Sequence, residues 1–310
     1  MGVDTLRRLM AERKWVLAEA LADDLFHVGA FADSESAYVA YALARSRSNQ
    51  DKYSTALEPG QVGAYLARQS QDFDLFGRCL LELAYIESRI PGQEQEAVHT
   101  YHQFLDHRQH YSDDVRFTIP DALFNLAVVE RNCGKASDAM QHFREAVESA
   151  RRVGTTPERI EVYTRNLRWQ ALQVGDLALS ESLIRDGEAY CKRHPEAKTA
   201  RVHLLNDKAW YAVSTGNHDL AVPLILEAIT LGDSIDDSSA LAQSVLIWSR
   251  ICEKEGNLDG AMGLGIWAHI EAQRSQRPEL VAEVQKVLRG IRIQDRETVV
   301  RSMTPMLRPA

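Results

Sequence analysis

The stretch LFNLAVVERNCGKASDAMQHFREAV, residues 123–147, places Gly134 between two segments whose apolar residues recur with helical spacing. Three later stretches align with it on a glycine: residues 164–188, 205–229 and 246–270. The four glycines, Gly134, Gly175, Gly216 and Gly256, are separated by 41, 41 and 40 residues. The sequence therefore contains an internal repeat, with one unit about every 41 residues.

Small residues recur at two fixed positions after each of these glycines. The first position holds Ala139, Ser180, Ala221 and Ala261, and the second holds Ala146, Gly187, Ala228 and Ala268. Small side chains allow two antiparallel helices to approach closely, and glycine permits a tight turn between them. Each repeat is predicted to be a helical hairpin.

The repeat resembles the tetratricopeptide repeat, whose usual period is about 34 residues. The first stretch matches the family at Leu126, Ala127, Gly134, Ala139, Phe143 and Ala146. The longer period implies either extra helical turns or extended loops, such as VGTTPER (153–159) and GDSIDDSS (232–239). One departure is Arg168, which stands where the family has a small residue.

Weaker copies precede the first clear repeat. Gly92, Ala97 and Tyr101 fit the pattern, and residues 9–26 and 52–70 fit the period with poorer turns. The prediction is an all-α, right-handed superhelical solenoid of about seven hairpins over residues 3–275, closed by a helix at 277–290. We expect residues 1–290 to form the helical repeat domain and residues 291–310 a C-terminal capping helix or tail.

In tetratricopeptide arrays, the first helix of each hairpin lines a concave groove. Asn125, Asn166 and Asp207 lie nine residues before their turn glycines, and Trp169, Trp210 and Arg250 lie six before theirs. Amides can pair with a peptide backbone, indoles offer broad apolar contact, and guanidinium groups bind carboxylates. The predicted ligand-binding residues are Asn125, Arg131, Arg165, Asn166, Trp169, Asn206, Asp207, Trp210 and Arg250. Two alternatives stay open: the asparagines bond the neighbouring turn, and the tryptophans pack between repeats.

Residues 54–290, including AYLARQSQDFDLFGRCLLELAYIE (64–87), resemble the Rap, NprR and PlcR group of bacterial peptide receptors. The resemblance implies that Asn125 and Asn166, with Asn206 or Asp207, hold the backbone of a signal peptide. Residues 5–25 read as a repeat hairpin rather than the helix-turn-helix of a PlcR-like regulator. Residues 1–60 do not clearly give the three-helix bundle of a Rap phosphatase. The resemblance therefore implies binding more directly than any output activity.

A net charge of −8 and a pI near 5.7 argue against direct nucleic-acid binding, which depends on clustered Lys and Arg. The N-terminal residues carry charges too frequently for a secretion signal, and no apolar run is long enough to span a membrane. We expect a cytoplasmic protein without membrane contact. A homodimer is compatible with the sequence, which does not decide the oligomeric state.

No catalytic motif is recognisable, and no cofactor is expected. Four isolated cysteines, in apolar helical stretches, are predicted to be buried thiols. His99, His102, Asp106 and His110 share a helical face, but we interpret them as a helix end and predict no metal site.

The resulting hypothesis is a non-enzymatic protein whose partner is a peptide or another protein, with an intracellular signalling receptor as its finer form. Two alternatives remain: a scaffold that assembles through its outer surface, and a Rap-like phosphatase acting on a response regulator.

Overall fold

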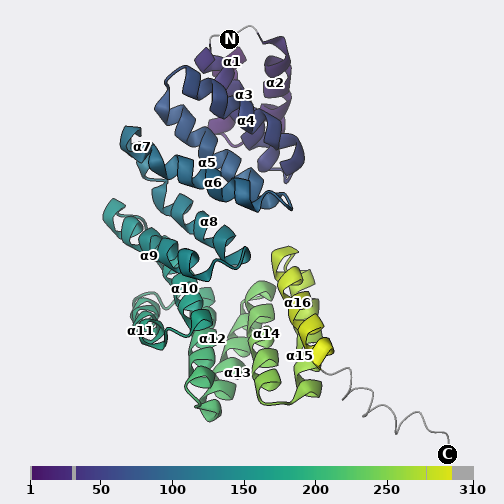
Figure 1. Ribbon diagram of the computed structural model, residues 1–310. Helices are drawn as coiled ribbons and strands as arrows, with labels where there is room; N and C mark the ends of the chain where they lie inside the picture. The colour runs from purple at the N-terminus through teal and green to yellow at the C-terminus, as the bar shows by residue number, and fades with distance from the viewer. Residues whose placement is uncertain (1, 30–32, 277, 295–310) are drawn as a thin grey trace, which may run out of the picture. The chain divides into compact units, whose positions relative to one another are not determined.

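A computed structural model describes residues 2–29, 33–276 and 278–294, and every regular element in these ranges is a helix (Figure 1). The chain divides into two compact units, Met1–Tyr163 and Thr164–Ala310. The all-α prediction is confirmed. Seven helical hairpins, followed by a last single helix, account for the repeats within these described ranges.

The helices of unit 1 form four hairpins, with a short insertion between the third and the fourth. They are α1 (Gly2–Ala11), α2 (Trp15–Val28), α3 (Asp33–Ser48), α4 (Tyr53–Gln69), α5 (Phe73–Arg89), α6 (Glu94–Asp106), η1 (Arg108–His110), α7 (Asp113–Arg116), α8 (Ile119–Asn132) and α9 (Ala136–Val153). The predicted hairpin near the start of the chain is thus confirmed as α1 and α2.

Three further hairpins and the last helix follow, and the boundary between the units falls inside the first of these helices. They are α10 (Pro157–Val174), α11 (Leu177–Arg193), α12 (Lys198–Ser214), α13 (His218–Ser234), α14 (Ser238–Lys254), α15 (Leu258–Arg274) and α16 (Pro278–Gln294).

The repeat pattern folds as predicted. Each of the four repeat glycines has a positive φ, between 78° and 79°, which residues with a Cβ rarely adopt. The small residues that follow are buried in the hairpin contacts, as are Leu126 and Phe143 of the first stretch. The glycines therefore set the turns, and the small residues allow the two helices to pack closely.

The long period arises from long helices rather than from extended loops. Helices α9 and α10 each have 18 residues, and only Gly154–Thr156 separates them. Residues 232–234 of the predicted GDSIDDSS loop belong to α13. Asp237 then accepts a hydrogen bond from the backbone N–H of Ala240 at 2.9 Å, so its carboxylate caps α14.

The prediction for residues 52–70 was wrong, because this stretch is the single helix α4 and not a hairpin. Pro59 lies inside the helix and cannot donate a hydrogen bond to the carbonyl of Thr55. The Arg47 Nη1 donates to that carbonyl at 2.9 Å instead. The turn lies earlier, between α3 and α4, where Asp51 has a φ of 59°.

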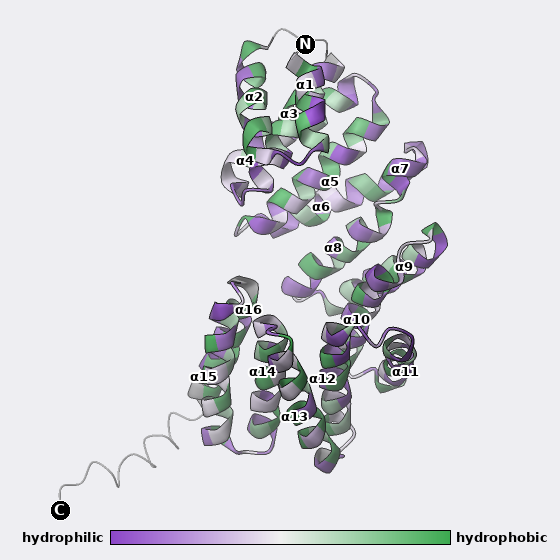
Figure 2. Cartoon of the chain, turned by 180° about the vertical axis from the view of Figure 1, so that it is seen from behind, coloured by the Kyte–Doolittle hydropathy of each residue, from purple (hydrophilic) through white to green (hydrophobic). Residues whose placement is uncertain are grey.

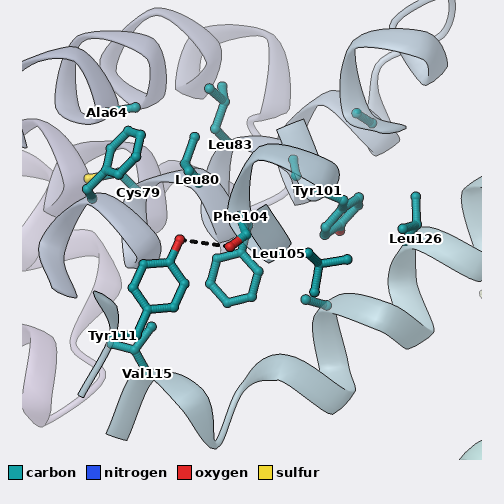
Figure 3. Close-up of a cluster of buried hydrophobic side chains, with 14 of the residues drawn as sticks. Ala64, Cys79, Leu80, Leu83, Tyr101, Phe104, Leu105, Tyr111, Val115 and Leu126 are labelled. Carbon is teal, nitrogen blue, oxygen red and sulfur yellow. Dashed lines mark hydrogen bonds between the residues drawn. The ribbon is translucent and has the colours of Figure 1, made fainter. Parts of the chain in front are cut away.

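Hydrophobic and hydrophilic residues are interspersed along the helices (Figure 2). On α9 the buried residues that share one side are Ala139, Phe143, Ala146 and Ala150. In unit 1 the apolar sides of α5, α6 and α8 meet in a core around Tyr101 and Phe104 (Figure 3). The Tyr111 hydroxyl donates to the Phe104 carbonyl at 2.9 Å, which ties the insertion to the same core.

The last helix, α16, extends past residue 290, where the predicted repeat domain ends. Its Ile291 is buried against Cys252 and Ala261. The predicted tail from residue 295 onward lies outside the described residues. Of the four cysteines, Cys79 and Cys252 are buried, whereas the other two are partly exposed. None of the described helices is long and apolar enough to cross a membrane.

Candidate functional site

The predicted ligand-binding residues are divided between the two units. Asn125 and Arg131 lie on α8 of unit 1, and the remaining seven lie on α10, α12 and α14 of unit 2. Each unit is therefore considered by itself.

In unit 1, both predicted residues contact the hairpin core. The partly exposed Asn125 side chain lies beside the hydroxyl of Tyr101, a residue whose pKa is raised by burial. The Arg131 guanidinium lies over the Phe143 ring, 5.6 Å from its centroid. Both residues therefore have a contact within unit 1, and their role in ligand binding stays a prediction.

In unit 2, Arg168 and Asp207 form a buried ion pair between α10 and α12. Arg168 is 0% exposed, and its Nε donates to the Asp207 Oδ2 at 2.6 Å. The Arg168 Nη1 also donates to the carbonyl of Leu183 at 3.2 Å. Burial raises the pKa of Asp207, and the Arg168 and Arg165 charges oppose that effect.

Gly187 provides the space for this arginine. A Cβ at position 187 would lie 2.6 Å from the Arg168 Nη1, whereas the equivalent residues of the neighbouring hairpins are alanines. Three residues that differ from their equivalents in neighbouring repeats thus belong to one arrangement. Arg168 and Gly187 stand where those repeats have alanine, and Asp207 stands where the two preceding repeats have asparagine. Their coincidence in adjacent helices was the sequence signal that could have predicted the pair.

This geometry corrects the role predicted for Asp207, whose buried carboxylate is already bound by Arg168. The neighbouring Asn206 is only 2% exposed, and neither of its amide atoms has a hydrogen-bond partner among the described residues. Both side chains are buried in unit 2.

The two predicted tryptophans lie next to each other on adjacent first helices. Trp169 of α10 and Trp210 of α12 have ring centroids 6.0 Å apart. Trp210 packs into the core with Ile247 and Ile251, as the packing alternative predicted, whereas Trp169 is partly exposed at its edge. The exposed Lys254 of α14 places its Nζ 4.6 Å from the Trp210 ring centroid.

Arg250 lies one turn before Lys254 on α14, and its Nη2 is 3.4 Å from the Glu283 Oε1 of α16. We call Trp169, Trp210, Arg250 and Lys254 the tryptophan strip. Asn166, partly exposed, lies one turn before Trp169 on α10. Lys254 was not predicted, although its position four residues after Arg250 puts both on one face of α14.

The histidines of residues 99–110 make separate contacts with different aromatic residues. His107 packs edge-on against Phe76, and His110 stacks on Phe73. Across the described residues, no group of three or more His, Cys, Asp or Glu side chains is arranged to hold a metal ion.

A histidine–glutamate pair, His142 and Glu130, joins α9 to α8 within their hairpin. The His142 Nδ1 is 2.6 Å from the Oε2 of Glu130, which is buried. This hydrogen bond raises the pKa of His142, and the nearby charges of Glu145 and Asp138 act in the same direction. The His102 ring packs edge-on against His142.

This pair predicts a pH dependence of stability. Because the folded state raises the His142 pKa, its contribution is fully present below the unfolded value, about 6.5, and is lost as the pH rises through the folded value. We expect the urea midpoint of the wild-type chain to fall between pH 6 and pH 8.5. His142→Gln should show a flatter dependence over that range, and an unchanged slope would contradict this role.

Comparisons with known proteins agree with the hairpin architecture. Residues 81–156 match the family model of anaphase-promoting complex subunit 5, and no curated protein matches the chain. The apo form of RapI is similar with a TM-score of 0.65 and 10% identity, over 93% of this chain and 98% of that one. A tetratricopeptide repeat protein from Parabacteroides merdae has a TM-score of 0.60 and 14% identity, over 93% and 97%.

A Rap protein complexed with Competence and Sporulation Factor is also similar, with a TM-score of 0.51 and 10% identity, over 94% of this chain and 74% of that one. At these identities the likeness concerns the fold alone. The chain is therefore built of tetratricopeptide-like helical hairpins and resembles the Rap proteins in fold.

Proposed function

We propose that this chain is a non-enzymatic binding protein that holds an extended peptide, or an extended segment of a partner protein, against the first helices of unit 2. The observation that carries the proposal is the tryptophan strip, which continues across α10, α12 and α14. The strip combines aromatic surface with polar groups, which is the composition expected of a peptide site.

The spacing of the helices suits an extended chain. Packed helices lie about 8–10 Å apart, and an extended peptide advances about 3.3 Å per residue. About three peptide residues would therefore pass each first helix. Asn166, one turn before Trp169 on α10, has an amide side chain, which contains both a donor and an acceptor.

The likeness to a Rap protein complexed with Competence and Sporulation Factor supports the finer form of the proposal, a regulatory peptide receptor. In that form the peptide contacts Asn166, Trp169 and Arg250, and the buried Trp210 packs beside Trp169.

A second candidate function is assembly through the outer surface. On α15, Ile266, Trp267 and Ile270 are 51%, 37% and 51% exposed, and their spacing puts them on one side of the helix. Exposed apolar patches of this kind often mark interfaces.

One experiment separates the two candidates. Peptides selected on the immobilised full chain are titrated calorimetrically into the wild type and three variants. Asn166→Ala should weaken binding about two- to tenfold, the range for one hydrogen bond. Asn132→Ala, on an exposed asparagine of α8, and Trp267→Glu, on the outer surface, should bind within about twofold of the wild type, because neither alters the strip.

Equal binding by the wild type and Asn166→Ala would remove the asparagine from the site. Loss of binding in Trp267→Glu alone would favour assembly through the outer surface.

A further inference from the structure

The tryptophan strip has an unusual polarity for a chain with a net charge of −8. The polar groups of its exposed and partly exposed members are the indole N–H of Trp169, the guanidinium of Arg250 and the ammonium of Lys254, whereas Trp210 packs into the core. All of them donate hydrogen bonds, and none accepts one. A ligand that satisfies the strip must therefore supply acceptors.

The Lys254 ammonium group, at one end of the strip, has no acidic partner in the described part of the chain. Glu253 and Glu255 flank Lys254 in the sequence. Its ammonium group instead lies over the Trp210 ring. An ammonium on an indole face keeps donors for an incoming anion, because the ring contacts only one side of the group.

Two carboxylates lie on the neighbouring elements. Asp207 is held by Arg168 beneath the surface, and Glu283 forms a partly exposed ion pair with Arg250 at 3.4 Å, which a peptide carboxylate would have to replace. Arg250 and Lys254 lie one helical turn apart, so their charged groups can meet two carboxylates of one peptide segment. A chain terminus would supply only one.

We propose that the ligand of the tryptophan strip is an acidic peptide segment, whose Asp or Glu side chains pair with Lys254 and Arg250 while its apolar atoms lie on Trp169. This inference rests on the proposed peptide-binding function and adds the chemical class of the partner.

The test uses two pools of nonapeptides with amidated C-termini. The pools are identical except that three positions are Asp or Glu in one and Asn or Gln in the other. Each pool is passed over the immobilised full chain, and the retained peptides are identified by mass spectrometry. We expect retention of the acidic pool to exceed that of the amide pool, and the best acidic peptide is then used for titration.

Lys254→Gln should weaken that peptide about fivefold, the order of one partly exposed ion pair. The matched control is Lys192→Gln, which removes the same charge from an exposed position on α11 and should change the affinity by less than about twofold.

The outcomes separate the two levels of the proposal. Equal retention of the acidic and amide pools would overturn the acidic ligand while leaving peptide binding intact. Equal losses in Lys254→Gln and Lys192→Gln would also overturn it, because they would indicate attraction by net charge alone. If neither pool is retained above a matrix without protein, the proposed function fails as well.

Discussion

Arg168→Ala is expected to lower the free energy of unfolding of unit 2 by about 3–5 kcal/mol, the cost of breaking a buried ion pair from one side. The substitution leaves the Asp207 carboxylate buried without its cation, because that side chain is only 4% exposed. Tryptophan fluorescence in urea is a suitable measurement, since Trp169, Trp210, Trp248 and Trp267 all lie in unit 2.

Arg185→Ala is the matched control. Arg185 forms only an exposed pair with Glu181 on α11, with side chains 67% and 53% exposed, so its removal should change stability by less than about 1 kcal/mol. Equal effects of the two arginine substitutions would contradict the buried pair.

A triple variant tests whether Arg168, Gly187 and Asp207 depend on one another. Arg168→Ala, Gly187→Ala and Asp207→Asn together restore the residue types of the neighbouring repeats and remove both buried charges. Most of the stability lost in Arg168→Ala should return. Gly187→Ala alone should destabilise the protein by about 1–3 kcal/mol, because the new Cβ would meet the arginine.

Phe143→Ala is expected to lower the free energy of unfolding of unit 1 by about 3–5 kcal/mol, the usual range for a buried phenylalanine. The Phe143 side chain is fully buried between α8 and α9, with its ring centroid 5.6 Å from that of Phe124. The unfolding transition is followed by far-UV circular dichroism, which reports the helices of both units.

Phe117→Ala makes the same chemical change at a residue that is 53% exposed. It should cost less than about 1 kcal/mol, because little apolar surface is returned to water. A comparable loss in both variants would mean that the hairpin contact is not where unit 1 gains its stability.

The candidate site could be predicted only in part. The position of each residue relative to its turn glycine correctly placed Trp169, Trp210 and Arg250 on the first helices. The same rule also selected Asn206 and Asp207, which are buried, and it missed Lys254. Spacing identifies a face of a helix, but it does not show how deeply a neighbouring helix covers that face.

The sequence by itself determined the helical hairpin and its repetition. A tight turn requires a glycine with positive φ, and a close helix contact requires small residues at fixed positions after it. Both requirements are local, so the sequence of each repeat is enough to predict its hairpin. The tertiary structure decided what depends on contacts between different helices. The α4 helix passes through Pro59 because Arg47 satisfies the Thr55 carbonyl, and Arg168 is tolerated in a core because Gly187 and Asp207 receive it. Such compensation lies in contacts between helices, and no local pattern encodes it.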